Sequence, residues 1–460
     1  MLKHISKLLI FAIMLPAVAA IPVAAQSGDI TPPLAQATST AGFLLLLPLG
    51  LLLLSLSALP NAETDAPQAA ITALTVWGLA VLAYFFAGFA LEFGGVAVSN
   101  PHPDFAELYW NWSPLSPAFG PNWGFVGLRG WLLLGAAATP GVYDLFLRHA
   151  ALLGVVIIPP VLALFRRVRW WQLAIFGIIG GTVIYPLAGN WVWSGGWLAN
   201  LGINLQLGHG FVDAGIATPL VIAGAITLTA LWVTKPAPPA ETESPPEAES
   251  VPAENTDPFP ETPMPAAYLP VFSLLGLGLV LWSWAFAANG QHIPTATDLA
   301  IPRAALNGFL GAFAGLVVAG LYSQFTTTRI DVQMTARGAI AGLATTAAGA
   351  ALMLPWQAVL LGAIAGALLP PLVYFVDRRL GLADVTAAGA MLGAMGTLGW
   401  LAVGLVADGS TGSGWNGVTG NIALNFPAQL NAQLLGAAVV IGWTVLATWV
   451  TFRVLKRAGG

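Results

Sequence analysis

Long apolar runs dominate this sequence of 460 residues and constrain its fold more than any other feature. A run of about 20 apolar residues crosses the hydrocarbon core of a bilayer as an α-helix, because a helix pairs its own backbone groups where no water is present. Only 8% of the residues are charged and 57% are hydrophobic, which leaves too little charge to cover a soluble protein of this length. The sequence therefore predicts an all-α polytopic membrane protein.

Eleven such runs follow the N-terminal segment. They cover approximately residues 40–59, 69–93, 143–165, 171–192, 209–233, 267–289, 301–325, 333–353, 356–377, 384–408 and 428–452. Residues 1–25 carry two lysines, an apolar stretch and small residues at the end, which is typical of a cleaved signal peptide. A short first membrane anchor is the alternative. Cleavage would leave the mature N-terminus outside the cell membrane.

The distribution of basic residues tests this orientation independently. With the N-terminus outside, the outer side receives only Arg129, Arg148 and Arg303. The cytoplasmic side receives Arg166, Arg167, Arg169, Lys235, Arg329, Arg337, Arg378, Arg379, Arg453, Lys456 and Arg457. Basic residues gather on the cytoplasmic side of membrane proteins. We therefore expect a multi-pass protein of the cell (inner) membrane with a cytoplasmic C-terminus.

The polar segment at residues 234–266 divides the chain into two halves. Its prolines and acids oppose helix formation and leave nothing to bury, so it is expected to be a disordered cytoplasmic linker. Five spans lie before it, in 26–233, and five lie after it, in 267–408. The remaining part, 409–460, holds an outer loop, the eleventh span and a short cytoplasmic tail. Because an odd number of spans reverses the direction of entry, the layout predicts an inverted five-plus-five repeat with a site between the halves.

Five segments carry a resemblance to a known family: "YFFAGFALEFGG" (84–95), "FRRVRW" (165–170), "YPLAGNWVWSGGWLANLG" (185–202), "GAIAGLATTAAG" with "PWQAVLLGAIAGAL" (338–368) and "GAMGTLGWLAVGLVADG" (393–409). In this order and spacing they resemble conserved segments of the ammonium transporter/Rh family, and the similarity extends from about residue 75 to 450. The resemblance implies eleven spans, an inverted repeat, and a homotrimer in the lipid bilayer with one narrow apolar pore in each protomer.

The resemblance also implies pore residues. Trp193 corresponds to a tryptophan at the outer vestibule, where an indole face attracts a cation. Phe286 corresponds to the inner phenylalanine of the gate. Leu152 stands where the family has the outer gate phenylalanine, and Gly290 stands where a serine usually contacts the ion.

The paired pore histidines of the family are missing. By its distance from Trp193, Asp213 takes the first histidine position, and Leu392 takes the second. Leu205 replaces an aspartate that precedes the first histidine. Asp213 either lines the pore, where a carboxyl could bind ammonium, or is satisfied by neighbouring helix groups and holds two spans together.

These features favour transport of ammonium or ammonia, with selectivity altered by Asp213 and Leu392. A non-conducting ammonium sensor on the same scaffold is one alternative, and an unrelated secondary transporter of a small solute is another. The histidines show no metal-ligand spacing, the chain has no cysteine, and no phosphate-binding glycine loop is present. We therefore expect no enzymatic activity, no cofactor, no metal and no nucleic-acid partner.

Overall fold

The structure is a computed structural model that describes residues 43–99, 101–120, 123–235, 268–287, 300–406 and 422–459. These residues all belong to one compact unit, Thr38–Gly460. The expected signal peptide (1–25), almost all of the linker (234–266) and most of the outer loop after residue 408 lie outside the described residues.

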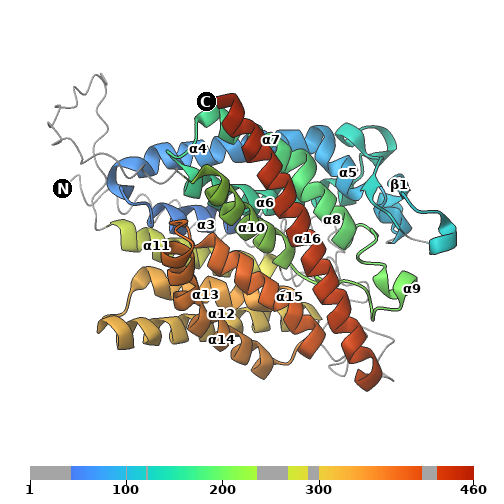
Figure 1. Ribbon diagram of the computed structural model, residues 1–460. Coiled ribbons are helices and arrows are strands. Elements are labelled where there is room, and N and C mark those ends of the chain that lie inside the picture. Colours follow the sequence, from blue (N-terminus) through green and yellow to red (C-terminus); the bar gives the residue numbers. More distant parts are fainter. Residues whose placement is uncertain are drawn as a thin grey trace, which may run out of the picture. The chain divides into compact units, whose positions relative to one another are not determined.

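Helices build almost all of this unit (Figure 1). The α-helices are α3 (Leu46–Leu56), α4 (Ala62–Ala83), α5 (Phe89–Phe93), α6 (Pro140–Leu164), α7 (Trp170–Ile179), α8 (Tyr185–Trp193), α9 (Leu201–Leu205), α10 (Ala217–Thr234), α11 (Tyr268–Ala287), α12 (Ala300–Thr327), α13 (Val332–Ala347), α14 (Pro355–Tyr374), α15 (Met395–Val406) and α16 (Ile422–Gly459). Four π-helical segments interrupt or end them, namely η1 (Tyr84–Gly88), η7 (Gly180–Ile184), η8 (Phe375–Arg379) and η9 (Gly389–Ala394).

Short elements between α5 and α6 form the loop that joins the second and third expected spans. They are the 3-10 turns η2 (Val96–Val98), η3 (Pro103–Phe105), η4 (Pro117–Phe119), η5 (Trp131–Leu133) and η6 (Gly135–Ala137), and the strands β1 (Asn111–Trp112) and β2 (Val126–Gly127). The two strands pair antiparallel, with Asn111 opposite Gly127. Trp191 fixes this loop to α8, because its indole N–H donates to the Phe125 carbonyl at 2.9 Å.

Eight helices of the described chain are long and apolar enough to cross a membrane. They are 62–98, 140–164, 170–193, 217–234, 302–327, 355–379, 389–406 and 429–459. Three shorter helices, α3, α11 and α13, lie where the other three spans were expected. The prediction of an all-α polytopic membrane protein is thus confirmed, and the count of eleven spans stays a prediction.

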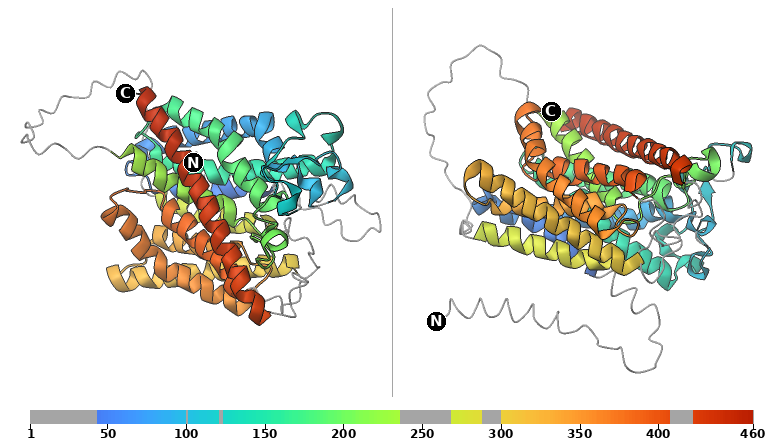
Figure 2. Two further views of the ribbon diagram at one scale, coloured as in Figure 1. Left: turned by 45° about the vertical axis from the view of Figure 1, so that its right-hand side comes forward. Right: turned by 90° about the horizontal axis from the view of Figure 1, so that it is seen from below.

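Corresponding helices of the two halves make corresponding contacts. In the first half, α3 and α4 pack on α6, and α4 also packs on α7. In the second half, α11 and α12 pack on α13, and α12 also packs on α14. The halves meet where α3 contacts α11 and where α10 contacts η9. The long helix α16 packs against α10 and α15 and can be followed along the unit in both views of Figure 2.

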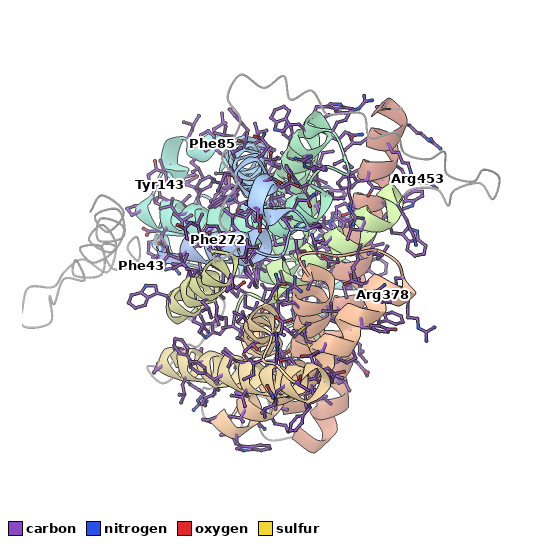
Figure 3. All side chains as sticks on the ribbon, turned by 90° about the vertical axis from the view of Figure 1, so that its left-hand side faces the viewer. Phe43, Phe85, Tyr143, Phe272, Arg378 and Arg453 are labelled. Carbon is purple, nitrogen blue, oxygen red and sulfur yellow. The ribbon has the colours of Figure 1, made fainter. Side chains whose placement is uncertain are left out.

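Basic side chains expected on the cytoplasmic side meet at one end of the helices. Arg166 forms an ion pair with Asp65 at 2.6 Å, and Arg167 donates to the Leu382 carbonyl at 3.1 Å. Lys235 donates to the Leu380 carbonyl at 3.0 Å. The pKa of Arg167 is lowered, because partial burial disfavours its charge more than two nearby aspartates favour it. Arg378 and Arg453 project from one side of the unit in Figure 3.

The three helices α12, α13 and α14 approach one another through glycines. A Cβ on Gly342 of α13 would overlap with the carbonyl oxygen of Gly311 on α12, and a Cβ on Gly362 of α14 would overlap with the same oxygen. Lipid gives helices no hydrophobic reason to associate, so close contact between small residues supplies the attraction instead.

We expect Gly342→Ala to lower the melting temperature of the purified protein, because the added methyl group forces α12 and α13 apart. Overpacking of this kind costs about 1–3 kcal/mol. Gly78→Ala in α4 is the matched control, since a Cβ there meets no atom within 4 Å. The control should be neutral or stabilising by about 0.5–1 kcal/mol, the usual gain for alanine over glycine in a helix. Equal melting temperatures for the two variants would contradict this account of the packing.

Candidate functional site

Trp193 ends α8 and is partly buried in the structure. Its indole N–H donates to the backbone carbonyl of Asp213 at 3.1 Å, which fixes the plane of the ring. The imidazole of His149, on α6, lies edge-on to the indole with the ring centroids 5.4 Å apart. The side chain expected at the outer vestibule is therefore held in one orientation from two sides.

Asp213 lies before the helix of the fifth expected span rather than inside it. The expected span began at residue 209, whereas α10 begins at Ala217. The backbone of Gly208 and Gly210 has positive φ, a conformation that glycine adopts without strain and that ends regular structure here. Asp213 thus stands at the N-terminal end of α10, where unpaired N–H groups and the helix dipole favour a negative charge.

The carboxylate of Asp213 is buried and fully engaged. It accepts hydrogen bonds from the backbone N–H groups of Gly215 (3.2 Å), Ala217 (3.3 Å) and Thr218 (2.6 Å). The Thr218 hydroxyl donates at 2.6 Å, and the indole N–H of Trp400 on α15 donates at 3.4 Å. These bonds hold the start of α10 to α15. Of the two interpretations that the sequence left open, they support the structural one.

Leu392 lies in η9, and no described contact brings it to Asp213. Trp400 follows Leu392 by two helical turns, which is about 12 Å along a helix axis. η9 and the first turn of α15 face α10 between Val221 and Leu228. A Cβ on Gly396 would lie 2.8 Å from Val221, and one on Gly224 would overlap with Gly393.

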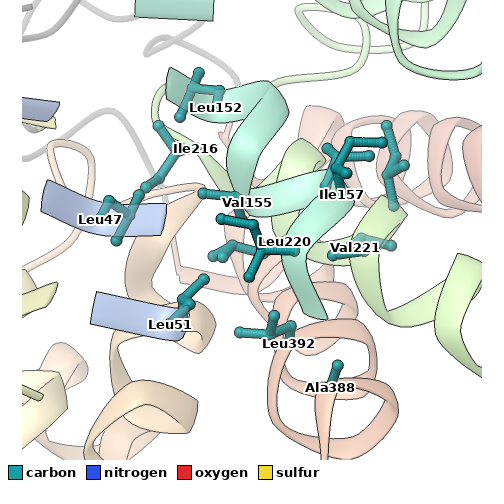
Figure 4. Close-up of a cluster of buried hydrophobic side chains, with 14 of the residues drawn as sticks. Leu47, Leu51, Leu152, Val155, Ile157, Ile216, Leu220, Val221, Ala388 and Leu392 are labelled. Carbon is teal, nitrogen blue, oxygen red and sulfur yellow. The ribbon is translucent and has the colours of Figure 1, made fainter. Parts of the chain in front are cut away.

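Leu152 and Leu392 belong to one buried hydrocarbon cluster. Figure 4 shows them with Val155, Leu220 and Val221 between α6, α10 and η9. Leu152 is 3% exposed and Leu392 is 0% exposed. None of the side chains labelled in Figure 4 is polar. Phe286 lies in α11, but its side chain is outside the described part, as is the whole of Gly290. Leu205 ends α9 and is exposed.

The structure brings together a second group of polar side chains, which the sequence analysis did not connect. Glu92 on α5 and His149 on α6 are both 0% exposed, and the Glu92 Oε1 atom lies 3.0 Å from His149 Nδ1. Tyr84 donates its hydroxyl to Glu92 Oε2 at 2.8 Å. His149 Nδ1 shares a hydrogen bond with the Tyr185 hydroxyl at 2.7 Å. We call Glu92, His149, Tyr84 and Tyr185 the outer polar cluster.

One signal in the sequence pointed to this cluster. Glu92 and His149 each stand within an apolar run, and ionisable residues at such positions usually mark function. Spacing along the chain could not reveal that the two runs pack together, because His149 and Glu92 are far apart in sequence.

A separate cavity of about 400 Å³ opens among the basic residues at the other end of the helices. It is lined by Arg166, Arg167, Val168, Arg169, Gln172, Thr234, Phe452, Lys456 and Gly459. The cavity shares no residue with the outer polar cluster or with Trp193.

Comparisons with known proteins agree with this arrangement. A family model described as Ammonium Transporter Family matches residues 40–460. The ammonium transporter Amt2 of Archaeoglobus fulgidus is 29% identical over 350 residues, which cover 74% of this chain and 70% of that protein. The ammonium transporter of Bacillus subtilis is 24% identical over 346 residues, which cover 71% of this chain and 78% of that protein.

Solved structures share the fold. A structure described as a sensor Amt protein superposes with a TM-score of 0.71 at 20% identity and covers 92% of this chain and 93% of its own. Mep2 of Candida albicans superposes with a TM-score of 0.66 at 19% identity and covers 91% of this chain and 82% of its own. Similarity at these identities concerns the fold alone. The family match over nearly the whole chain confirms the resemblance seen in the sequence: this protein belongs to the ammonium transporter family, a family of transporters and not of enzymes.

Proposed function

We propose that the protein moves ammonium or ammonia across the cell membrane through a narrow apolar passage in each protomer. The observation that carries the proposal is the order of the side chains. An aromatic ring oriented for a cation, Trp193, lies next to a buried hydrocarbon cluster that contains Leu152 and Leu392. A cation gains about 0.5–2 kcal/mol over an indole face. Hydrocarbon beyond it favours a small neutral molecule over an ion.

The proposed architecture has eleven spans, with an inverted repeat of spans one to five (26–233) and six to ten (267–408) and a last span within 409–460. The matched contacts of α3, α4 and α6 with those of α11, α12 and α13 support this proposal. The first expected span also meets the sixth, and the fifth meets the tenth. A two-fold axis in the membrane plane would produce this pairing, so it supports the proposal as well.

The proposed orientation places the N-terminus outside and the C-terminus in the cytoplasm. Residues 1–25 would be removed as a signal peptide, and residues 234–266 would form a disordered cytoplasmic linker. It is supported by the basic side chains of Arg166, Arg167 and Lys235, which gather at one end of the helices. Large apolar side chains are exposed on α12, α14 and α16, for example Phe325 and Trp356. Lipid or neighbouring copies in a homotrimer would cover them.

The direct test is flux through the purified protein in liposomes. We expect ammonium-driven transport that potassium does not reproduce, because potassium cannot release a neutral form into a hydrocarbon passage. Recording charge movement in the same vesicles shows whether ammonium or ammonia is the species that crosses. Wild-type vesicles that equilibrate ammonium no faster than empty ones would refute transport, and the sensor function would then replace it.

Trp193→Leu should weaken the apparent affinity for ammonium about two- to thirty-fold, which corresponds to a cation–π energy of about 0.5–2 kcal/mol. The maximal rate should change less, because the indole contacts the ion before the narrow passage and not within it. Trp110→Leu, an exposed tryptophan of the outer loop, is the matched control. An unchanged affinity in Trp193→Leu would assign this indole to anchoring alone.

Asp213→Asn distinguishes the two roles proposed for Asp213. We expect a lower melting temperature, because hydrogen bonds to a charged group contribute about 1.5–3 kcal/mol and the amide keeps only one accepting oxygen. Thr218→Val, which removes one donor to the same carboxylate, should give a smaller loss of the same kind. If Asp213→Asn instead abolishes flux at an unchanged melting temperature, Asp213 is a pore ligand.

A further inference from the structure

The outer polar cluster lies where an ion leaving Trp193 would meet the hydrocarbon cluster. His149 contacts the Trp193 ring on one side, with centroids 5.4 Å apart. On its own helix, α6, His149 precedes Leu152 by three residues, or about one turn. The cluster therefore stands between the expected outer site and the first hydrocarbon side chain of the passage.

Glu92 has an oxygen atom that is available to a ligand. Its Oε2 accepts the Tyr84 hydroxyl, but its buried Oε1 accepts no hydrogen bond from any described residue. The Nδ1 atom of His149 lies 3.0 Å from Oε1 and 2.7 Å from the Tyr185 hydroxyl, with which it shares a hydrogen bond. A buried carboxylate oxygen that accepts nothing loses about 1–3 kcal/mol, more when it is charged. Asp213, by contrast, has both oxygens engaged.

The neighbouring helix makes room for this oxygen. Gly189 of α8 faces Glu92, and a Cβ at that position would overlap with Oε1. The Asn190 side chain donates to the Glu92 carbonyl at 2.7 Å and so fixes α5 against α8. Packing alone would be served equally well by a hydrocarbon side chain at position 92, because replacing a buried ion pair with hydrocarbon is often neutral or stabilising.

We propose that Glu92 binds ammonium through Oε1 and accepts its proton before ammonia enters the hydrocarbon passage, with His149 as the residue that positions the carboxylate. This inference rests on the proposed transport function. The site takes over the proton chemistry for which Leu392 has no group.

The step balances as follows. Ammonium donates one N–H to Oε1, that N–H bond breaks with its electron pair staying on nitrogen, and an O–H bond forms on the carboxylate. The products are ammonia and a neutral carboxyl. The carboxyl returns the proton to water on the side from which ammonium arrived. Leu152 and Leu392 have no group that could carry the proton inward.

Charged and titratable groups surround the pair of Glu92 and His149, and they come from α5, α6 and the neighbouring elements. Tyr84 and Tyr185 bond to it directly. Arg148 immediately precedes His149 on α6, but Arg148 is paired with Asp144 at 2.7 Å, which reduces its repulsion of an arriving cation. Asp213 accepts from the Trp193 indole at its backbone carbonyl, and its carboxylate is held by five donors. Asp144 also has an oxygen without a hydrogen-bond partner among the described residues, but Asp144 is already paired with the Arg148 cation, so the Glu92 carboxylate is the acid of this group with an oxygen left for a cation.

The experiment compares Glu92→Gln with Glu107→Gln, an exposed glutamate of the outer loop, in reconstituted vesicles. Glu92→Gln should lower the maximal ammonium flux about 100-fold, the usual loss when a general base is removed. The dependence of the remaining flux on pH should disappear, and Glu92→Asp, which keeps the acid, should restore part of it. Glu107→Gln should behave as the wild type.

His149→Gln and the exposed His102→Gln form the second pair. A positioning role predicts that His149→Gln shifts the pH profile and reduces the flux less than Glu92→Gln does. Ammonium chloride should raise the melting temperature of the wild type more than that of Glu92→Gln, with potassium chloride as the salt control. Without ammonium, Glu92→Gln should melt no lower than the wild type, because it removes a buried charge.

The inference fails if Glu92→Gln keeps the wild-type affinity and pH profile, or if its flux falls only in proportion to unfolded protein. A wild type that moves no ammonium overturns the proposed function instead. In that case the melting experiment decides the site alone: stabilisation by ammonium that depends on Glu92 supports it, and stabilisation that is equal or absent in both proteins refutes it.

Discussion

The cost of placing a charge in hydrocarbon is the constraint on which the rest of this structure depends. Transfer of an unpaired ion from water to a medium of low dielectric costs of order 20 kcal/mol before relaxation. The chain answers in three ways. Most basic residues stand at helix ends, as Arg166 and Lys235 do. The carboxylate of Asp213 is stabilised by hydrogen bonds from N–H groups at the start of α10. Glu92 is held by a tyrosine and lies beside a histidine, with one oxygen left over.

How far the sequence predicted the fold follows from what is encoded locally. A span depends on a continuous apolar run, so the expected spans 143–165 and 171–192 agree with α6 and with the helix from Trp170 to Trp193 within a few residues. The start of α10 was placed too early, because hydropathy cannot separate a helix from an apolar loop. The positive φ of Gly208 and Gly210 keeps this segment from forming a helix, and the Asp213 carboxylate accepts from the first N–H groups of α10. Both effects depend on backbone geometry, which hydropathy does not report.

The candidate site was less predictable, because its partners come from distant parts of the chain. Asp213 was noticed as an acid in an apolar segment, but its bond to Trp400 joins residues that are 187 positions apart. The resemblance assigned Asp213 and Leu392 to the two histidine positions, while the contacts of Gly393 and Gly396 place η9 and the first turn of α15 against a later part of α10. Glu92 and His149 were both visible as ionisable residues in apolar runs, and only the packing of α5, α6 and α8 joins them.

The position of Glu92 matters because of the hydrocarbon cluster that contains Leu152 and Leu392. The side chains of Leu152 and Leu392 offer no hydrogen bond to replace the hydration shell of an ion, and desolvation disfavours potassium and ammonium alike beside them. Ammonium differs from potassium only in that it can become neutral by losing a proton. A passage of this kind therefore selects ammonium if a proton acceptor stands before the hydrocarbon begins. If the proton acceptor stood deeper inside, the ion would have to lose its hydration shell before it could lose its proton. His149 stands one helical turn before Leu152 and against the Trp193 ring, and Glu92 lies 3.0 Å from His149.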